Sequence, residues 1–213
     1  MQTSIHIQCD ELPWSAGNTP GVEYKTLSPA AELGGFEVSL VRLAAGASFV
    51  PPASARTVEV FVLTGSWDSA DGTLQPNSYL RSSPAQIESN STEAGCTLFV
   101  RAIDAADPSD VSVTAQTDEL PWHPGHGNLR VKPLHSHGTE GTALVHWPQN
   151  ERFIPHRHFG GEEIFVLSGT FLDEHGRYPK HSWILNPHLS AHHPFVEEET
   201  VILVKTGHLA ARA

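Results

Sequence analysis

Short runs of hydrophobic residues recur along the whole chain. The runs EVSLVRL, VEVFVLTG and CTLFVRA lie in the first half, and GTALVHW, EEIFVLSG and TVILVKT lie in the second. They are rich in Val, Leu, Ile and Phe, and clusters of Gly, Pro, Asn and Ser separate them, which is typical of β-strands. No long segment keeps an apolar period of 3.6 residues, and 17 Gly and 16 Pro interrupt the chain. The pattern predicts an all-β protein.

The two halves are copies of one unit. A shift of 104 positions places FVPPASARTVEVFVLTGSW, residues 49–67, on FIPHRHFGGEEIFVLSGTF, residues 153–171. The sequence DELPW also occurs twice, at 10–14 and at 118–122, and the polar segment AIDAADPSD separates the copies. We therefore predict two tandem jelly rolls or small β-barrels, with domains at 1–107 and 108–213.

The second copy carries potential metal ligands that the first copy lacks. Alternate side chains of a strand point to the same face, so His156 and His158 can place two imidazoles on one ion. The pair Gly160-Gly161 favours a tight reversal, after which Glu162 opens the next strand on a face that apolar residues continue. A carboxylate on such a face is costly to bury unless a cation pairs with it. These residues predict a metal site.

A fourth ligand is expected from the segment PHLSAHHPF, residues 187–195. It offers two adjacent histidines, His192 and His193. Neighbouring residues of a strand face opposite sides, so at most one of them reaches the site. Strand alternation does not choose between them.

In the first copy, the same shift replaces the candidate ligands by Pro52, Ser54, Val58 and, for His192, Glu88. One carboxylate is too few for a transition-metal site. The apolar positions are kept, so we expect the first copy to fold and to serve as a structural partner.

Charge and cysteine usage restrict the partners. The chain has 24 acidic and 13 basic residues, a net charge of -11, which would repel a phosphate backbone, so nucleic acid is not an expected partner. No segment resembles a signal peptide or a membrane span, so no membrane is expected. Cys9 and Cys96 lack zinc-knuckle or redox spacing, which favours a reduced, cytoplasmic protein. Most of the 14 histidines lie between His123 and His193, which places the chemistry in the second half.

The ligand pattern resembles the first motif of the cupin family. That motif has a His-x-His pair, a Glu four residues after the second His and a Gly seven residues after the Glu, and it is met by His156, His158, Glu162 and Gly169. The second half is similar to one branch, the ChrR-like cupin domains of anti-sigma factors, through GTFLDEHGRYPKHSWILNP and a Pro-x-x-Ser-x-His-x-Pro element at 187–194. The resemblance implies two cupin domains and His192 as the fourth ligand, with His193 as its outward neighbour.

The resemblance is incomplete at two points. The second cupin motif usually has a Gly two residues after its Pro, whereas Pro179 is followed by Lys180 and His181. Regulators of the ChrR type also carry an N-terminal helical zinc module that grips the sigma factor, and this chain begins directly in a cupin. We therefore do not expect direct sigma-factor binding.

Two functions fit this pattern. Three imidazoles and one carboxylate complete a closed tetrahedral site, which favours one zinc ion per chain and a sensory or regulatory role that responds to a small molecule. The alternative is a non-haem, iron-dependent dioxygenase acting on a small diketone or aryl ketone, because iron keeps open positions beside four protein ligands. Metal affinity does not separate zinc from iron, nickel or manganese. No catalytic residue is assigned, and a homodimer is expected by analogy with other cupins.

The remaining histidines have simpler interpretations. His135 and His137 are predicted to lie in a solvated loop before the strand GTALVHW. His146 lies inside that strand, where it either orients a ligand from the cavity side or packs elsewhere. Exposed loops are expected to hold the histidines His175, His181 and His188.

Overall fold

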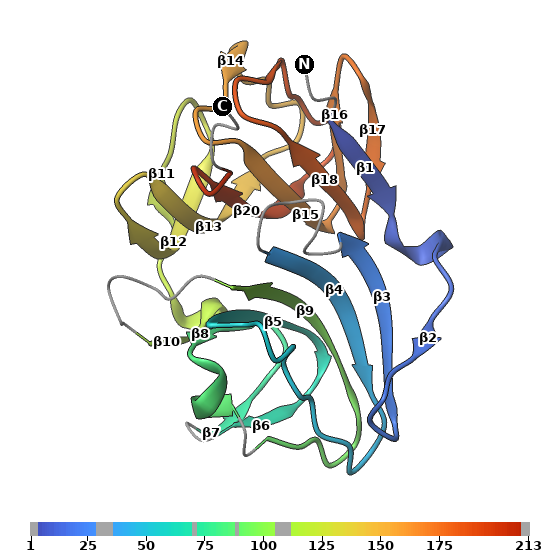
Figure 1. The fold of residues 1–213 in the computed structure, drawn as a ribbon. Coiled ribbons are helices and arrows are strands. Elements are labelled where there is room, and N and C mark those ends of the chain that lie inside the picture. The colour runs from blue at the N-terminus through green and yellow to red at the C-terminus, as the bar shows by residue number, and fades with distance from the viewer. Residues whose placement is uncertain (1–3, 29–35, 70–71, 88–89, 105–111, 210–213) are drawn as a thin grey trace. The chain divides into compact units, whose positions relative to one another are not determined.

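The protein is an all-β molecule in every part that the structure, a computed structural model, describes: residues 4–28, 36–69, 72–87, 90–104 and 112–209 (Figure 1). These residues contain no α-helix, and their helical turns are η1 (Cys9–Glu11), η2 (Pro84–Ile87) and η3 (Thr117–Glu119). None of them forms a helix long and apolar enough to cross a membrane. The predicted fold class is confirmed.

The N-terminal barrel, which comprises Leu12–Leu120, is built on a seven-stranded antiparallel sheet. Its strands run in the order β10 (Val113–Gln116), β8 (Ser78–Ser82), β5 (Thr57–Gly65), β9 (Cys96–Ile103), β4 (Phe36–Leu43), β3 (Val22–Ser28) and β2 (Ser15–Ala16). A hairpin of β6 (Trp67–Ser69) and β7 (Gly72–Leu74) completes it. Alternate residues of the strands point inward and form a buried core around Val60, Trp67 and Leu98.

The C-terminal barrel, which comprises Met1–Glu11 and Pro121–Ala213, repeats this architecture. Its strands run in the order β1 (Ile5–Gln8), β18 (Ser182–Asn186), β15 (Glu162–Ser168), β20 (Thr200–Thr206), β13 (Glu140–Trp147), β12 (Arg130–His137) and β11 (His123–Pro124). Two short two-stranded sheets pair β14 (His156–Arg157) with β19 (Ala191–His192), and β16 (Thr170–Asp173) with β17 (Gly176–Pro179). The core contains Trp147, Ile164 and Phe171.

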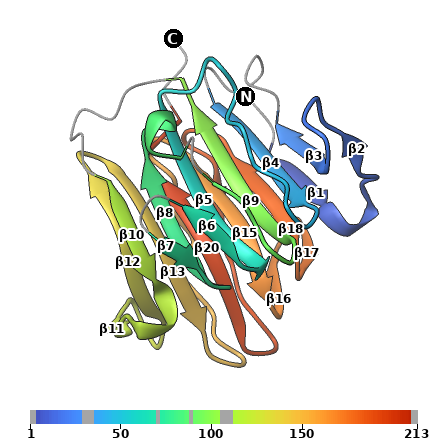
Figure 2. The same cartoon turned by 90° about the horizontal axis from the view of Figure 1, so that it is seen from below.

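The two sequence copies exchange their first strands. Strand β1 opens the first copy but pairs with β18 of the second, with Ile7 opposite Trp183. Strand β10 opens the second copy but pairs with β8 of the first, with Ala115 opposite Tyr79, and Figure 2 shows both strands beside their partners. The C-terminal unit is therefore built from two separate stretches of the sequence, whereas the N-terminal unit is the single stretch Leu12–Leu120. The division at residue 107 stays a prediction about the sequence repeat.

The turn between β17 and β18 accommodates the departure from the second cupin motif. His181 has φ 65°, in the left-handed region that glycine usually occupies, and Asn77 has φ 68° at the same position of the first copy. The Nδ1 atom of His181 lies 3.1 Å from an Asp10 carboxylate oxygen, and the backbone oxygen of His181 accepts a hydrogen bond from Cys9. These contacts hold the turn against the segment that follows β1.

The predicted loop at His135 and His137 is wrong. Both residues belong to β12, where His135 lies opposite Thr142 in β13 and His135 is buried. A register shift between Pro133 and His135 lets the strand continue past the proline, which has no N–H to donate. The turn-forming residues in this segment led to the loop prediction, although the β12–β13 hairpin extends to the pair His137 and Glu140.

Candidate metal centre

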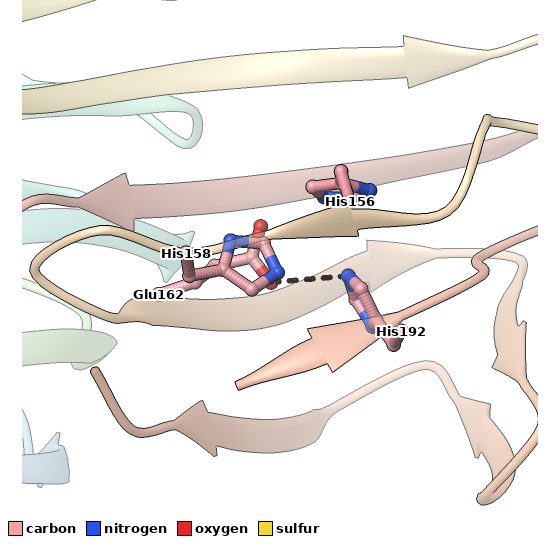
Figure 3. Close-up of side chains that lie close together, drawn as sticks. All are labelled: His156, His158, Glu162 and His192. Carbon is pink, nitrogen blue, oxygen red and sulfur yellow. Dashed lines mark ion pairs between the residues drawn. The ribbon is translucent and has the colours of Figure 1, made fainter. Parts of the chain in front are cut away.

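Four predicted ligands converge in the C-terminal barrel. One possible ligand atom from each of His156, His158, Glu162 and His192 lies within 4.8 Å of all the others. Figure 3 shows these side chains together, with an ion pair drawn between Glu162 and His192. Oε2 of Glu162 lies 3.4 Å from Nε2 of His158 and 3.6 Å from Nε2 of His192. The histidine ring centroids are 4.6 to 4.9 Å apart.

Backbone pairing explains why residues far apart in sequence meet here. His156 and His192 are direct partners in the β14–β19 pair. The N–H of His158 donates to the oxygen of Ser190 at 3.0 Å, and the N–H of Leu189 donates to the oxygen of His158 at 2.9 Å. The segment carrying His192 is thus clamped to the His-x-His strand.

The turn between His158 and Glu162 depends on two glycines. Gly160 and Gly161 have φ 79° and 73°, where other residues are strained. A Cβ on Gly160 would lie 2.7 Å from the backbone of Gly207, and a Cβ on Gly161 would lie 2.3 Å from the Leu209 side chain. The predicted tight reversal is confirmed, and it places Glu162 on β15 with its carboxylate beside the imidazoles.

The buried environment keeps the imidazole of His158 neutral and makes ionisation of the Glu162 side chain costly. Burial, with His192 and His156 nearby, lowers the pKa of His158 to about 3. Burial also raises the pKa of Glu162, although His192 and a 3.0 Å hydrogen bond from Asn186 oppose that rise. A divalent cation would reverse the shift at Glu162, because it favours the ionised carboxylate.

Asp173 orients His192. Burial alone would lower the pKa of His192, but the hydrogen bond to Asp173, with the charges of Glu162 and Asp173, raises it. Nδ1 of His192 lies 3.1 Å from Oδ2 of Asp173. The ionised Asp173 only accepts hydrogen bonds, so Nδ1 carries the proton and the Nε2 lone pair faces the other ligands. Asp173 was not predicted from the sequence, where its signal is an acidic residue at the end of an apolar strand.

The donor set fits a metal ion. Within the described part of the chain, the buried Nε2 of His158 has no hydrogen-bond partner. Nδ1 of His156 is engaged at 3.0 Å with the backbone oxygen of Ile154, which leaves its Nε2 free for a metal. Two zinc–ligand bonds of about 2.1 Å at a tetrahedral angle put the ligand atoms about 3.4 Å apart, close to the separation between His158 and Glu162.

A small apolar cavity adjoins the centre. It has a volume of about 150 Å³, and His156, Glu162 and His192 form part of its wall. Most of the remaining wall is apolar and comes from Leu129, Val145, Trp147, Phe153, Phe171, Pro194, Ile202 and Val204. Protein cavities of about 150 Å³ take up a molecule the size of benzene. A ligand in this cavity would touch the metal ligands.

The other histidines lie away from this cluster. His146 is on β13, with Nε2 3.4 Å from a Glu199 carboxylate oxygen and its ring against Trp122, so it does not orient a ligand. His193 is exposed, as the resemblance implied. His175 is exposed as predicted, whereas His181 and His188 are partly buried, and Nδ1 of His188 accepts the N–H of Gly160 at 2.8 Å.

The N-terminal barrel has no matching cluster among its described residues. Val58 lies opposite Ser82 in the register that places Glu162 opposite Asn186. Pro52 and Ser54 stand where His156 and His158 stand in the second copy, and Glu88, the counterpart of His192, lies outside the described residues.

Comparison with known proteins identifies the family of the chain and structures with a similar fold. The sequence matches the ChrR cupin-like domain twice, over residues 2–105 and 110–210. A search of curated proteins found no match. Similar solved structures include a candidate dioxygenase from Nostoc punctiforme, with a TM-score of 0.80 and 15% identity, covering 99% of this chain and 84% of that one.

Two further structures share the fold at low identity. A candidate glyoxylate-induced protein from Pseudomonas aeruginosa has a TM-score of 0.79 and 10% identity, covering 100% of this chain and 92% of that one. YlbA from E. coli has a TM-score of 0.74 and 12% identity, covering 99% and 93%. The chain belongs to the family of ChrR cupin-like domains and carries two copies of that domain.

Proposed function

We propose that the C-terminal barrel binds one divalent metal ion through His156, His158, Glu162 and His192, and that the chain has a sensory or regulatory role. The observation that carries the proposal is the convergence of four ligand atoms within 4.8 Å around a histidine nitrogen that lacks a hydrogen bond. Neutral imidazoles and a carboxylate are ligands that zinc accepts, so zinc is the proposed occupant.

The adjoining cavity suggests how such a centre would sense a molecule. Three of the four ligand residues form part of the cavity wall, so a bound molecule would contact them directly. Zinc, when bound, would supply a Lewis acid for an oxygen or nitrogen of that molecule. The hydrogen bond from His192 to Asp173 connects the centre to β16, which offers a route from ligand binding to the rest of the barrel.

A non-haem, iron-dependent dioxygenase is a second candidate, and the cavity is the observation that favours it. A closed structural site needs no space beside its ligands, whereas an oxygenase needs room for a substrate. The volume of about 150 Å³ and the apolar wall suit a small diketone or a single aryl ring. His158 and Glu162 would then hold the metal together with the two other histidines, and the apolar wall would exclude water.

Metal analysis combined with oxygen uptake separates the two candidates. The protein is purified without chelators or an immobilised-metal column, its metal content is measured, and oxygen consumption is followed with pentane-2,4-dione. We expect one zinc per chain and no oxygen uptake. Iron with turnover would establish the oxygenase instead. The variant His156→Ala should lose the metal, while the matched control His193→Ala, at an exposed histidine, should keep it.

A further inference from the structure

The N-terminal barrel, although it lacks the metal ligands, keeps a cavity at the equivalent position. The cavity has a volume of about 570 Å³, compared with about 150 Å³ beside the metal centre. Its wall includes Val41, Phe49, Pro52, Val100 and Ala102. The residues 104 positions later line the smaller cavity: Val145, Phe153, His156, Val204 and Thr206. The first copy has therefore lost the ligands without filling the space.

One wall of this cavity has gained polar side chains. Glu37 and Ser39 of β4 line it in place of Gly141 and Ala143 of the second copy, two residues without polar side chains. Two neighbours on β3, Tyr24 and Thr26, also line it. By strand register, Tyr24 and Thr26 correspond to Val131 and Pro133 of the second copy. Tyr24 lies opposite Val41 and Thr26 lies opposite Ser39, at the positions that Val131 and Pro133 occupy opposite β13. The wall combines one carboxylate, three hydroxyl groups and an aromatic ring.

Among the described residues, this wall carries an acidic side chain, Glu37, and no basic one. No Lys, Arg or His lines the cavity, and no basic side chain in the described part of the chain forms an ion pair with Glu37. The hydroxyl of Ser39 donates to a Glu37 carboxylate oxygen at 3.4 Å, which is a long bond. Burial, together with the charge of Glu37, raises the pKa of Tyr24, so its hydroxyl stays protonated.

Hydrogen bonds hold Phe49, one of the residues that line the cavity, in place. Asn90, which is buried, accepts the N–H of Phe49 at 2.7 Å and the indole N–H of Trp67 at 3.1 Å. Its side-chain amide donates to the oxygen of Phe49 at 2.7 Å. Phe49 opens the segment that runs on to Pro52 along the cavity. The cavity is thus pre-formed, as small-molecule sites usually are.

We propose that the N-terminal barrel is a second, metal-free binding site that takes a small organic ammonium ion. The carboxylate of Glu37 would pair with the ammonium group, and Ser39 and Thr26 would accept further N–H bonds. The face of the Tyr24 ring can attract the cation, while Val41 and Phe49 would cover the apolar body. A ligand with a carboxylate group is disfavoured, because its negative charge would be repelled by that of Glu37 and no basic side chain among the described residues of the cavity wall offsets it.

Benzylamine is the probe, with benzyl alcohol as its neutral analogue and benzoate as an anion, and binding is measured by isothermal titration calorimetry on the full chain. A ligand of this size should bind with a dissociation constant on the order of 1 mM. The variant Glu37→Gln should weaken benzylamine binding about tenfold or more, because the ammonium group loses its ionic partner and keeps only a neutral amide oxygen as acceptor. Benzyl alcohol should bind more weakly and lose little in the variant.

Two controls locate the site. Glu23→Gln changes an exposed carboxylate on β3 that pairs with Arg42, and it should leave benzylamine binding unchanged. His156→Ala should also leave it unchanged, which excludes coordination of the amine by the metal centre. If Glu37→Gln fails to fold, Ser39→Ala should weaken binding instead. No saturable benzylamine binding, equal affinity for the alcohol, or unchanged affinity in a folded Glu37→Gln variant would overturn the proposal, and the metal centre would be unaffected.

Discussion

The hydrogen bond between His192 and Asp173 determines which imidazole nitrogen faces the other ligands, and Asp173→Asn tests this. Oδ1 of Asp173 accepts the N–H of His175 at 2.8 Å, the N–H of Gly176 at 3.0 Å and the hydroxyl of Tyr178 at 3.1 Å. These donors would hold the amide oxygen of the new Asn, so its NH₂ group would face Nδ1 of His192. Nδ1 must then accept, and the proton moves to Nε2, the atom that a metal needs.

The expected loss follows from this tautomer change. Removing the carboxylate partner of a metal-binding histidine lowers metal affinity about 10- to 100-fold, or about 1.4–2.8 kcal/mol. Zinc affinity is measured by competition with a chromophoric chelator, and the tautomer of His192 by ¹⁵N NMR of the metal-free protein. Glu174→Gln is the matched control, because its carboxylate accepts the N–H of His193 and does not bond to His192. Unchanged affinity in a folded Asp173→Asn protein would show that the tautomer of His192 does not control metal binding.

Three further predictions concern stability. In the metal-free protein, His158 should lower the free energy of unfolding as the pH drops below 6.5, because its pKa is lowered to about 3 and the unfolded chain takes up the proton first, whereas His192, whose pKa is raised, contributes with the opposite sign. Urea unfolding at several pH values should show a shallower slope in His158→Gln, and an equal slope would contradict the pKa. Gly161→Ala should cost roughly 1–3 kcal/mol in thermal unfolding, because its φ is positive and Leu209 crowds the site, whereas the control Gly138→Ala, with φ 57° and no atom within 4 Å, should cost about 1 kcal/mol or less. A chain that begins at Leu12 loses β1 and should lose roughly 2–4 kcal/mol of stability in the C-terminal barrel, since the β1–β18 ladder disappears together with its roughly four backbone hydrogen bonds; two unchanged unfolding transitions in calorimetry would rule this out.

Strand alternation and the internal repeat predicted much of the site. Alternation placed His156 and His158 on one face, and the glycine pair correctly predicted the reversal that brings Glu162 beside them. Alternation could not choose between His192 and His193, since both faces of a short strand are equally available in the sequence. The family resemblance supplied that choice, and the structure places His192 in the cluster and exposes His193.

Features that depend on pairing across long sequence distances were not predictable. The exchange of β1 and β10 depends on which sheet edge each short strand meets, and four residues carry no pattern that specifies an edge. Asp173 orients His192 from another strand, so no local spacing relates the two residues. The polar wall at Glu37 became visible only when strand registers matched it with the second copy. The homodimer and the cytoplasmic location stay predictions.

Anomalous X-ray diffraction from crystals of the zinc-loaded protein would locate the metal ion directly. We predict one anomalous peak per chain, in the C-terminal barrel, about 2.0–2.2 Å from the ligand atoms of His156, His158, Glu162 and His192. A peak in the N-terminal barrel, or a loaded protein without a peak among these four residues, would contradict this prediction.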